Sequence, residues 1–177
     1  EAELTVGLTN VGEFGLKAAR DIAMLSYRSY DDFEIKQNDS APKADNFRAS
    51  SYVHYQGEKF VSRFKASAYY TLSKAMDSHD IARGRIGSRA EVLSNIRSRT
   101  LVIGINSDML FPLCEQEFLA NNIPDAELGV IDSPHGHDAF LIEYKILKNL
   151  VADFLHNNFK SYKPTSLKAR EQILNYN

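Results

Sequence analysis

The chain has 177 residues, of which 44% are hydrophobic and 25% charged, and its formal net charge is −2. This composition suits one globular domain with a sizeable core, and the near-neutral charge gives no reason to expect nucleic acid or an anionic membrane as a partner. Cys114 is the only cysteine, which excludes an internal disulfide and a thiolate-rich metal site. Because no apolar run approaches the ~20 residues of a membrane span, the sequence predicts a cytoplasmic protein.

The first half of the sequence predicts helices and loops but no strands. The first 14 residues are expected to form an irregular lead-in, and apolar positions at helical spacing begin at Leu16. Residues 31–48, rich in Asp, Asn and Ser, predict an exposed linker or loop. Further helices are expected at 58–64, 66–76 and near 89–96. We interpret this helical segment as a cap or an insertion rather than as sheet.

The pattern changes at Thr100. Residues 100–105 form a short, nearly all-apolar run that is typical of a strand buried on both faces. A helix is expected at about 112–121, a second strand at 127–131 and a long helix at about 138–159, before a polar tail. Since a strand–helix–strand crossover is right-handed and makes the strands parallel, the sequence predicts an α/β fold.

Polar residues follow each of the two predicted strands. Asp108 comes after the first strand and His137 after the second, 29 positions further on (137 − 108). The carboxyl ends of adjacent parallel strands meet at one edge of a sheet, so we expect the two side chains to lie together. A carboxylate in this position can hold the imidazole in the tautomer that a general base requires. Asp before His is also the order in which α/β-hydrolases supply the last two members of their catalytic triad.

Each of these residues also has a purely structural alternative. Asp108 could be a helix cap or a turn former, His137 a solvated loop histidine, and Asp138 the N-cap of the last helix. His135 and His137 could suggest a metal pair, but no third ligand stands at a suitable spacing. We therefore predict no metal site.

Several segments resemble a known family, in the correct order along the chain. Residues 105–112, with Glu115 and Gln116 just beyond, and residues 132–141 are similar to the segments that carry the triad Asp and His in homoserine O-acetyltransferases. The resemblance extends to the helix before the cap and to the cap itself, through residues 15–29, 50–69 and 75–85. It runs from about residue 12 to residue 159.

This resemblance implies a fold and a division of the chain. The fold would be the C-terminal part of an α/β-hydrolase fold, its last parallel strands and helices, with a helical cap or lid insertion. Residues 1–30 would end the N-terminal core part and carry a substrate-pocket helix, and residues 31–97 would form the cap. Residues 98–159 would be the C-terminal core with the triad Asp and His, followed by the tail at 160–177.

The resemblance also implies a role for five residues. Asp108 would orient His137, and His137 would shuttle the proton. Arg20 would pair with the substrate carboxylate, Tyr27 would line the same pocket, and Asp138 would receive the substrate ammonium group. Arg20 and Tyr27 are seven positions apart, two helical turns, and can share one helix face. Without the resemblance, a surface salt bridge and a core aromatic would be the preferred readings of these two.

The nucleophile that such a triad needs is not found in the sequence. None of the nine glycines stands in a Gly-x-Ser-x-Gly elbow. We therefore expect the chain to be one piece of an enzyme that works with an N-terminal segment of the same enzyme. The resemblance also implies a homodimer through the cap helices. The resemblance implies acyl transfer from acetyl-CoA, a co-substrate rather than a bound cofactor, to L-homoserine through an acyl-serine in methionine biosynthesis.

Three alternatives stay open at this point. A close relative could use succinyl-CoA, or serine in place of homoserine. The chain could instead be a non-catalytic binding module that keeps the hydrolase scaffold, although the intact set of Asp108, His137, Arg20 and Tyr27 argues against it. It could also belong to a hydrolase of esters or lactones, which Arg20 and Asp138, suited to an amino-acid zwitterion, disfavour.

Overall fold

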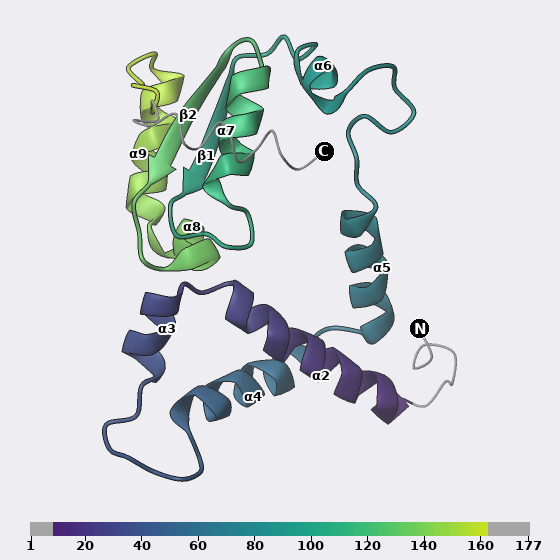
Figure 1. Ribbon diagram of the computed structural model, residues 1–177, viewed down its shortest axis with the longest axis vertical. Coiled ribbons are helices and arrows are strands. Elements are labelled where there is room, and N and C mark those ends of the chain that lie inside the picture. The colour runs from purple at the N-terminus through teal and green to yellow at the C-terminus, as the bar shows by residue number, and fades with distance from the viewer. Residues whose placement is uncertain (1–8, 163–177) are drawn as a thin grey trace. The chain divides into compact units, whose positions relative to one another are not determined.

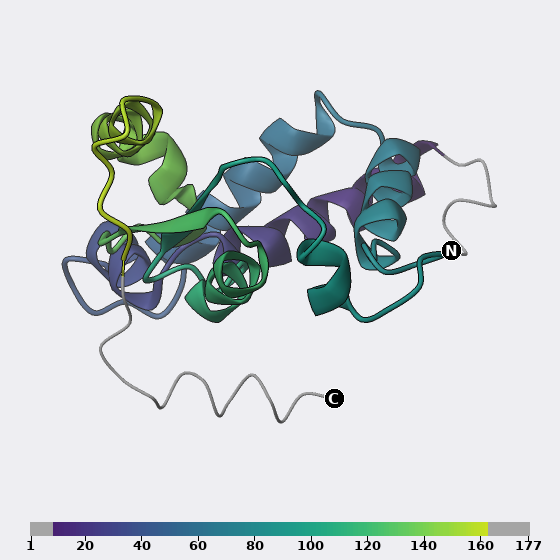
Figure 2. The ribbon, with the colours of Figure 1, turned by 90° about the horizontal axis from the view of Figure 1, so that it is seen from above.

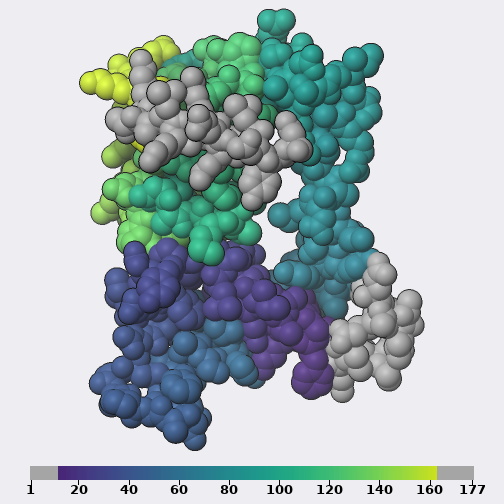
Figure 3. Space-filling view, viewed as in Figure 1, coloured from purple at the N-terminus to yellow at the C-terminus, as the bar shows by residue number. Residues whose placement is uncertain are grey.

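The structure, a computed structural model, describes residues 9–162 and divides into two compact units (Figure 1). The first unit is Glu1–Asp80 and the second is Ile81–Asn177. In the space-filling view the first unit is coloured purple to blue and the second teal to yellow (Figure 3). No helix among residues 9–162 is long and apolar enough to cross a membrane.

The first unit is built from helices, as predicted. They are α2 (Thr9–Ser26), α3 (Tyr30–Gln37), α4 (Arg48–Val61) and α5 (Ala66–Asp77). Helices α2 and α4 cross at Gly57, where an added Cβ would lie 2.7 Å from Lys17 Cγ and closer still to Asp21 Oδ1. Leu16 and Met24 of α2 are buried in this unit. The close approach therefore depends on glycine at the crossing point.

Three predictions for this unit were wrong in extent. Residues 9–14 are helical rather than irregular, and α4 begins ten residues before the predicted start at 58. Residues 31–48 are not all loop, because α3 occupies their first part. Helix α3 is held by its ends: the Ser29 hydroxyl caps it by accepting from the Asp32 N–H at 3.1 Å, and buried Asp32 pairs with Lys36 at 2.7 Å. These local interactions stabilise α3 in place of an apolar stripe, which is the pattern from which helices were predicted.

The second unit is a small α/β sandwich. Its two strands, β1 (Thr100–Ile105) and β2 (Ala126–Ile131), are parallel and in register from Thr100 opposite Ala126 to Ile105 opposite Ile131. The short helix α6 (Arg89–Leu93) precedes them, and α7 (Leu113–Asn122) connects them. After β2 come the 3₁₀ turn η1 (Gly136–Asp138) and the helices α8 (Ala139–Ile142) and α9 (Tyr144–Leu155). Both predicted strands are confirmed.

Helices α7 and α9 cover opposite faces of this sheet (Figure 2). A Cβ at Gly104 would lie 2.6 Å from Leu113 of α7, whereas a Cβ at Gly129 would lie 3.5 Å from Leu150 of α9. On the α9 side, buried Ile105 and Ile131 form the core. Burial of the sheet on both faces explains why both strands are nearly continuous apolar runs.

The single long helix predicted at 138–159 is wrong. Glu143, with φ −87° and ψ 37°, interrupts it between α8 and α9. The Glu143 carboxylate accepts a hydrogen bond from Ser133 Oγ at 3.1 Å, which ties the interruption to the loop after β2. Beyond α9 the chain returns to β2, where the Leu128 N–H donates to Ser161 Oγ at 2.9 Å. Most of the predicted tail, 163–177, lies outside the described residues.

Candidate active site

Strands β1 and β2 end at the same edge of the sheet, and the loop that follows each strand carries one predicted catalytic residue (Figure 1). Asp108 and His137 meet there, with 2.8 Å between Asp108 Oδ2 and His137 Nδ1. Parallel pairing in register, with the connection through α7, brings two residues 29 positions apart into direct contact.

Asp108 is fixed from two sides. Its Oδ1 accepts the backbone N–H groups of Leu110 at 2.8 Å and Phe111 at 2.9 Å, while Oδ2 faces His137. The Asp108 side chain is only 5% exposed, whereas that of His137 is 22% exposed. The carboxylate is therefore both the turn former of its loop and the hydrogen-bond partner of the imidazole.

The contact decides which ring nitrogen of His137 is available for proton transfer. An ionised carboxylate only accepts hydrogen bonds, so Nδ1 carries the proton and donates it to Asp108 Oδ2. Nε2 is then left with its lone pair and can take a proton from a hydroxyl. The His137 side chain is 22% exposed, so the hydroxyl of a bound molecule can approach its ring.

Two aromatic rings flank His137. The Phe111 ring lies 5.1 Å from the imidazole centroid and the Phe140 ring 5.3 Å, both edge to face. Phe111 follows the Asp108 turn and Phe140 lies in α8, so both loops supply a wall. Apolar walls on two sides restrict the ring to the orientation in which Nδ1 meets the carboxylate.

The two loops are also joined by polar side chains that sequence reasoning missed. Ser107 Oγ donates to the Ser133 carbonyl at 2.5 Å and accepts the Gly136 N–H at 3.0 Å. Asn106 donates to Asp132 through its amide nitrogen and accepts the Ser133 N–H at 3.1 Å through its amide oxygen. The position of Asn106 and Ser107 directly before Asp108 was the available signal, but their partners depend on the path of the second loop.

Asp138 lies next to His137 and immediately before α8. It is the last residue of η1 and the N-cap residue of α8, but its side chain makes no capping hydrogen bond there. Asp138 therefore occupies the N-cap position that the structural alternative predicted, without a side-chain capping bond. Asp138 is partly buried.

Arg20 and Tyr27 lie together in the first unit. The Arg20 guanidinium lies 5.1 Å from the centroid of the Tyr27 ring and 5.0 Å from that of Phe60 in α4. Arg20 Nε is buried and has no hydrogen-bond partner among the described residues. Arg20 is thus a cation held between rings rather than the surface salt bridge of the alternative reading.

A second tyrosine borders this cation. The Tyr69 ring of α5 lies 5.7 Å from the Phe60 ring. Burial and the neighbouring Tyr27 raise the pKa of the Tyr69 phenol, while the positive charge of Arg20 lowers it. Neither Phe60 nor Tyr69 was among the predicted site residues.

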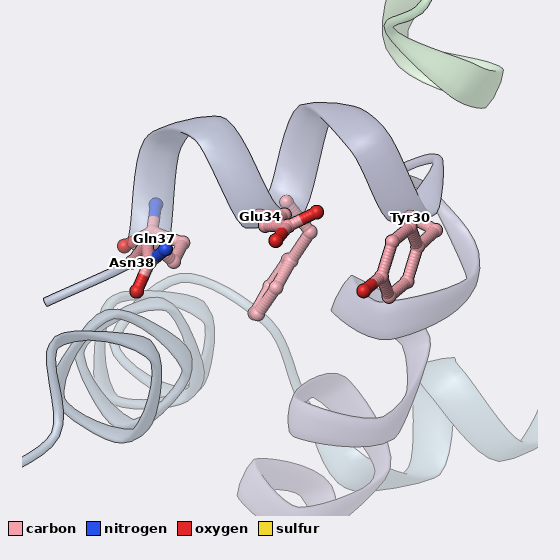
Figure 4. Close-up of a pocket in the computed structure, with 5 residues that line it drawn as sticks. Tyr30, Glu34, Gln37 and Asn38 are labelled. Carbon is pink, nitrogen blue, oxygen red and sulfur yellow. The ribbon is translucent and has the colours of Figure 1, made fainter.

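A shallow hollow of about 290 Å³ lies elsewhere in the first unit, along α3 (Figure 4). Tyr30, Glu34 and Gln37 project from α3 beside it, and none of the five predicted site residues lines it. The hollow is open, and the polar groups of its lining residues are not directed at a common point. We therefore prefer the Asp108–His137 pair as the candidate site. Residues 9–162 also hold no group of three or more His, Cys, Asp or Glu side chains that could bind a metal.

Comparisons with known proteins agree on one family. The chain is 45% identical over 161 residues to a homoserine O-acetyltransferase of Cyclobacterium marinum, covering 89% of this chain and 46% of that protein. It is 47% identical over 146 residues to one of Salinibacter ruber (81% and 41%) and 46% identical over 136 residues to one of Saccharomyces cerevisiae (77% and 28%). The chain therefore spans less than half the length of these curated relatives. No family model matches it.

Solved structures give the same fold. A homoserine O-acetyltransferase from Bacillus anthracis superposes with a TM-score of 0.74 at 20% identity, over 85% of this chain and 43% of that one. One from Staphylococcus aureus gives 0.65 at 26% identity, over 90% and 46%. An esterase gives 0.70 at 15% identity, over 80% and 42%, which shows the fold alone. The chain thus has part of an α/β-hydrolase fold.

Proposed function

This chain belongs to the homoserine O-acetyltransferase family, of whose curated members it spans less than half the length, and we propose that it supplies the acid–base half of an acetyltransferase active site. The observation that carries the proposal is the 2.8 Å contact between Asp108 Oδ2 and His137 Nδ1, with the other carboxylate oxygen occupied by two backbone N–H groups. This arrangement leaves Nε2 of His137 as the general base.

The proposed reaction has two acyl-transfer steps. In the first, His137 takes the proton of a serine hydroxyl, the serine oxygen attacks the thioester carbonyl of acetyl-CoA, and the CoA thiolate leaves with that proton. In the second, His137 takes the proton of the L-homoserine hydroxyl, whose oxygen attacks the acetyl-serine. The bond to serine breaks, serine recovers the proton, and O-acetylhomoserine is released, a product suited to methionine biosynthesis. Asp108 stabilises the imidazolium in both steps.

The nucleophilic serine is proposed to come from an N-terminal segment of the same enzyme. The 177 residues contain no Gly-x-Ser-x-Gly elbow, and β1 pairs only with β2 among the described residues, which leaves its other edge open to a further strand. Both features are consistent with a segment that completes the sheet and adds the nucleophile.

Arg20, Tyr27 and Asp138 are proposed to bind the amino-acid substrate. A guanidinium whose buried Nε has no partner within the described residues, held between the Tyr27 and Phe60 rings, suits a carboxylate ligand. Asp138, beside His137, would receive the ammonium group and so bring the substrate hydroxyl near Nε2. A zwitterion-binding pair favours amino-acid acyl transfer over ester hydrolysis.

Two further proposals concern assembly and location. A homodimer through the cap helices is supported by α5, which has no buried residue and leaves Leu72 54% and Met76 67% exposed. A cytoplasmic location rests on the sequence alone.

The test measures acetyl transfer from acetyl-CoA to L-homoserine in the protein that carries this chain. The released CoA thiol is the quantity that is monitored. His137→Ala should lower kcat by about 10³-fold or more, because removal of a triad histidine leaves only binding and oxyanion stabilisation. His135→Ala, two positions away on the same loop, is the matched control and should keep kcat within a few-fold. Equal activity of the two variants would refute the role of His137.

A further inference from the structure

The loop that carries His137 follows β2. It leaves β2 at Ile131 and reaches η1 through Gly136, whose φ of +63° lies in the left-handed region. Glycine adopts that conformation without the steric cost that a Cβ would bring. The backbone at Gly136 is therefore free of the steric limits of a Cβ directly before His137, the residue whose side-chain orientation matters most.

Ser107, in the loop that follows β1, bridges two points of the loop that carries His137. Its hydroxyl donates to the Ser133 carbonyl at 2.5 Å, near the start of the loop, and accepts the Gly136 N–H at 3.0 Å, directly before His137. One side chain thus satisfies a backbone acceptor and a backbone donor three residues apart. Ser133 is buried, so its backbone carbonyl has little access to water.

Ser107 is also the residue next to Asp108. Because the two are consecutive, the hydroxyl that holds Gly136 and the carboxylate that meets His137 move together with the end of β1. A shift of the second loop relative to the first would disturb both Ser107 hydrogen bonds together with the Asp108–His137 contact. The Ser107 side chain therefore fixes the separation between the loop that carries Asp108 and the loop that carries His137.

We propose that Ser107 is a positioning residue that clasps the 132–137 loop through the Ser133 carbonyl and the Gly136 N–H and so sets the Asp108–His137 hydrogen bond. The role in catalysis rests on the proposed acyl transfer, but the clasp itself does not. Ser107 touches no reacting atom and acts only through His137. Asn106 gives the same loop a second attachment, through Asp132 and the Ser133 N–H.

The test follows the Nδ1 proton of His137 by NMR, in the protein that carries this chain. A proton held between an imidazole and a carboxylate gives a sharp resonance far downfield of the other ring N–H signals, and the signal is lost when the bond opens to water. Ser107→Ala should broaden or abolish this resonance, and Ser107→Thr, which keeps the hydroxyl, should restore it. His137→Ala assigns the signal.

The matched control is Ser161→Ala. Ser161 also bonds the backbone of this sheet, accepting the Leu128 N–H at 2.9 Å, but within residues 9–162 it has no hydrogen bond to the 132–137 loop. The control should keep the His137 resonance. In the active protein, Ser107→Ala should lower kcat by about 10–100-fold, the cost of a misplaced catalytic group, with little change in the KM for the amino-acid substrate.

Three results would overturn the proposal. The resonance could persist unchanged in Ser107→Ala, it could be lost equally in Ser107→Thr, or it could be lost equally in Ser161→Ala, which would indicate general loosening of the unit. A protein that transfers no acetyl group but loses the signal selectively in Ser107→Ala would retain the clasp and refute the acetyltransferase proposal. The two failures are therefore distinguishable.

Discussion

At the scale of single residues, Arg20 stands out because its charge is held by rings rather than by a carboxylate. Its guanidinium lies about equally far from the Tyr27 and Phe60 rings, at 5.1 and 5.0 Å, and cation–π contacts of this kind attract a cation to the ring faces. The field of such a charge extends to neighbouring phenols. Tyr69, which stacks edge to face on Phe60, is therefore a built-in probe of Arg20.

This probe gives a titration prediction. Burial raises the pKa of the Tyr69 phenol and the Arg20 charge opposes that rise, so Arg20→Met should raise the pKa of Tyr69 further. Arg63→Met is the matched control, since Arg63 also approaches the Phe60 ring, at 5.9 Å, but does not act on Tyr69. NMR of ¹³Cζ-labelled tyrosine measures both. An unchanged or lower Tyr69 pKa in Arg20→Met would show that the guanidinium is screened by another anion.

The raised pKa of Tyr69 also determines how the stability of the fold depends on pH. The folded-state pKa of Tyr69 lies above that of the unfolded chain because burial disfavours the phenolate. Its contribution to stability is therefore complete below the ordinary tyrosine pKa and is lost as the pH rises through the folded-state value.

At the scale of elements, the crossing of α2 and α4 decides whether Phe60 reaches Arg20. Gly57 lies at this crossing, one turn of α4 before Phe60. Its missing Cβ lets the helices approach until Lys17 and Asp21 occupy the space. The aromatic contact to Arg20 therefore depends on a glycine that touches neither residue.

Gly57→Ala should lower the free energy of unfolding by about 1–3 kcal/mol, the usual cost of forcing extra volume into a packed contact. Gly12→Ala is the matched helical control, because its Cβ would lie an ordinary 3.5 Å from Ala66 Cβ. The control should be neutral or stabilising by up to about 1 kcal/mol, since alanine favours helix. Urea unfolding followed by circular dichroism compares the two. Equal effects would mean that the helices do not cross at Gly57.

The elements show which signals in a sequence determine structure. Strands β1 and β2 were predictable because a strand buried on both faces must be apolar throughout. Helix α3 was not predicted, because its stability comes from the Ser29 cap, acidic residues in its first turn and the Asp32–Lys36 pair rather than from an apolar stripe. Those signals were present in the sequence, but they are as common in loops as in short helices.

The candidate site divides in the same way. The meeting of Asp108 and His137 followed from strand order alone, because parallel strands bring their carboxyl ends to one edge. The Ser107 clasp and the Phe111 and Phe140 walls could not be predicted, since they depend on the path of a loop with a left-handed glycine. Topology positions the pair, and loop conformation aligns it.

At the scale of the whole molecule, the chain combines a helical unit that holds Arg20 with an α/β unit that holds Asp108 and His137. It matches less than half of the length of its curated relatives, and its 177 residues contain no Gly-x-Ser-x-Gly elbow. The central claim is that this chain activates a serine that lies outside its 177 residues.

The most direct test is peptide-resolved mass spectrometry of the protein after mixing with acetyl-CoA in the absence of L-homoserine. The account predicts an acetyl group on a serine in a Gly-x-Ser-x-Gly-like elbow outside this sequence, absent in His137→Ala and discharged when L-homoserine is added. An acetyl group on a residue within these 177, or an acetyl-serine that forms equally in His137→Ala, would contradict it.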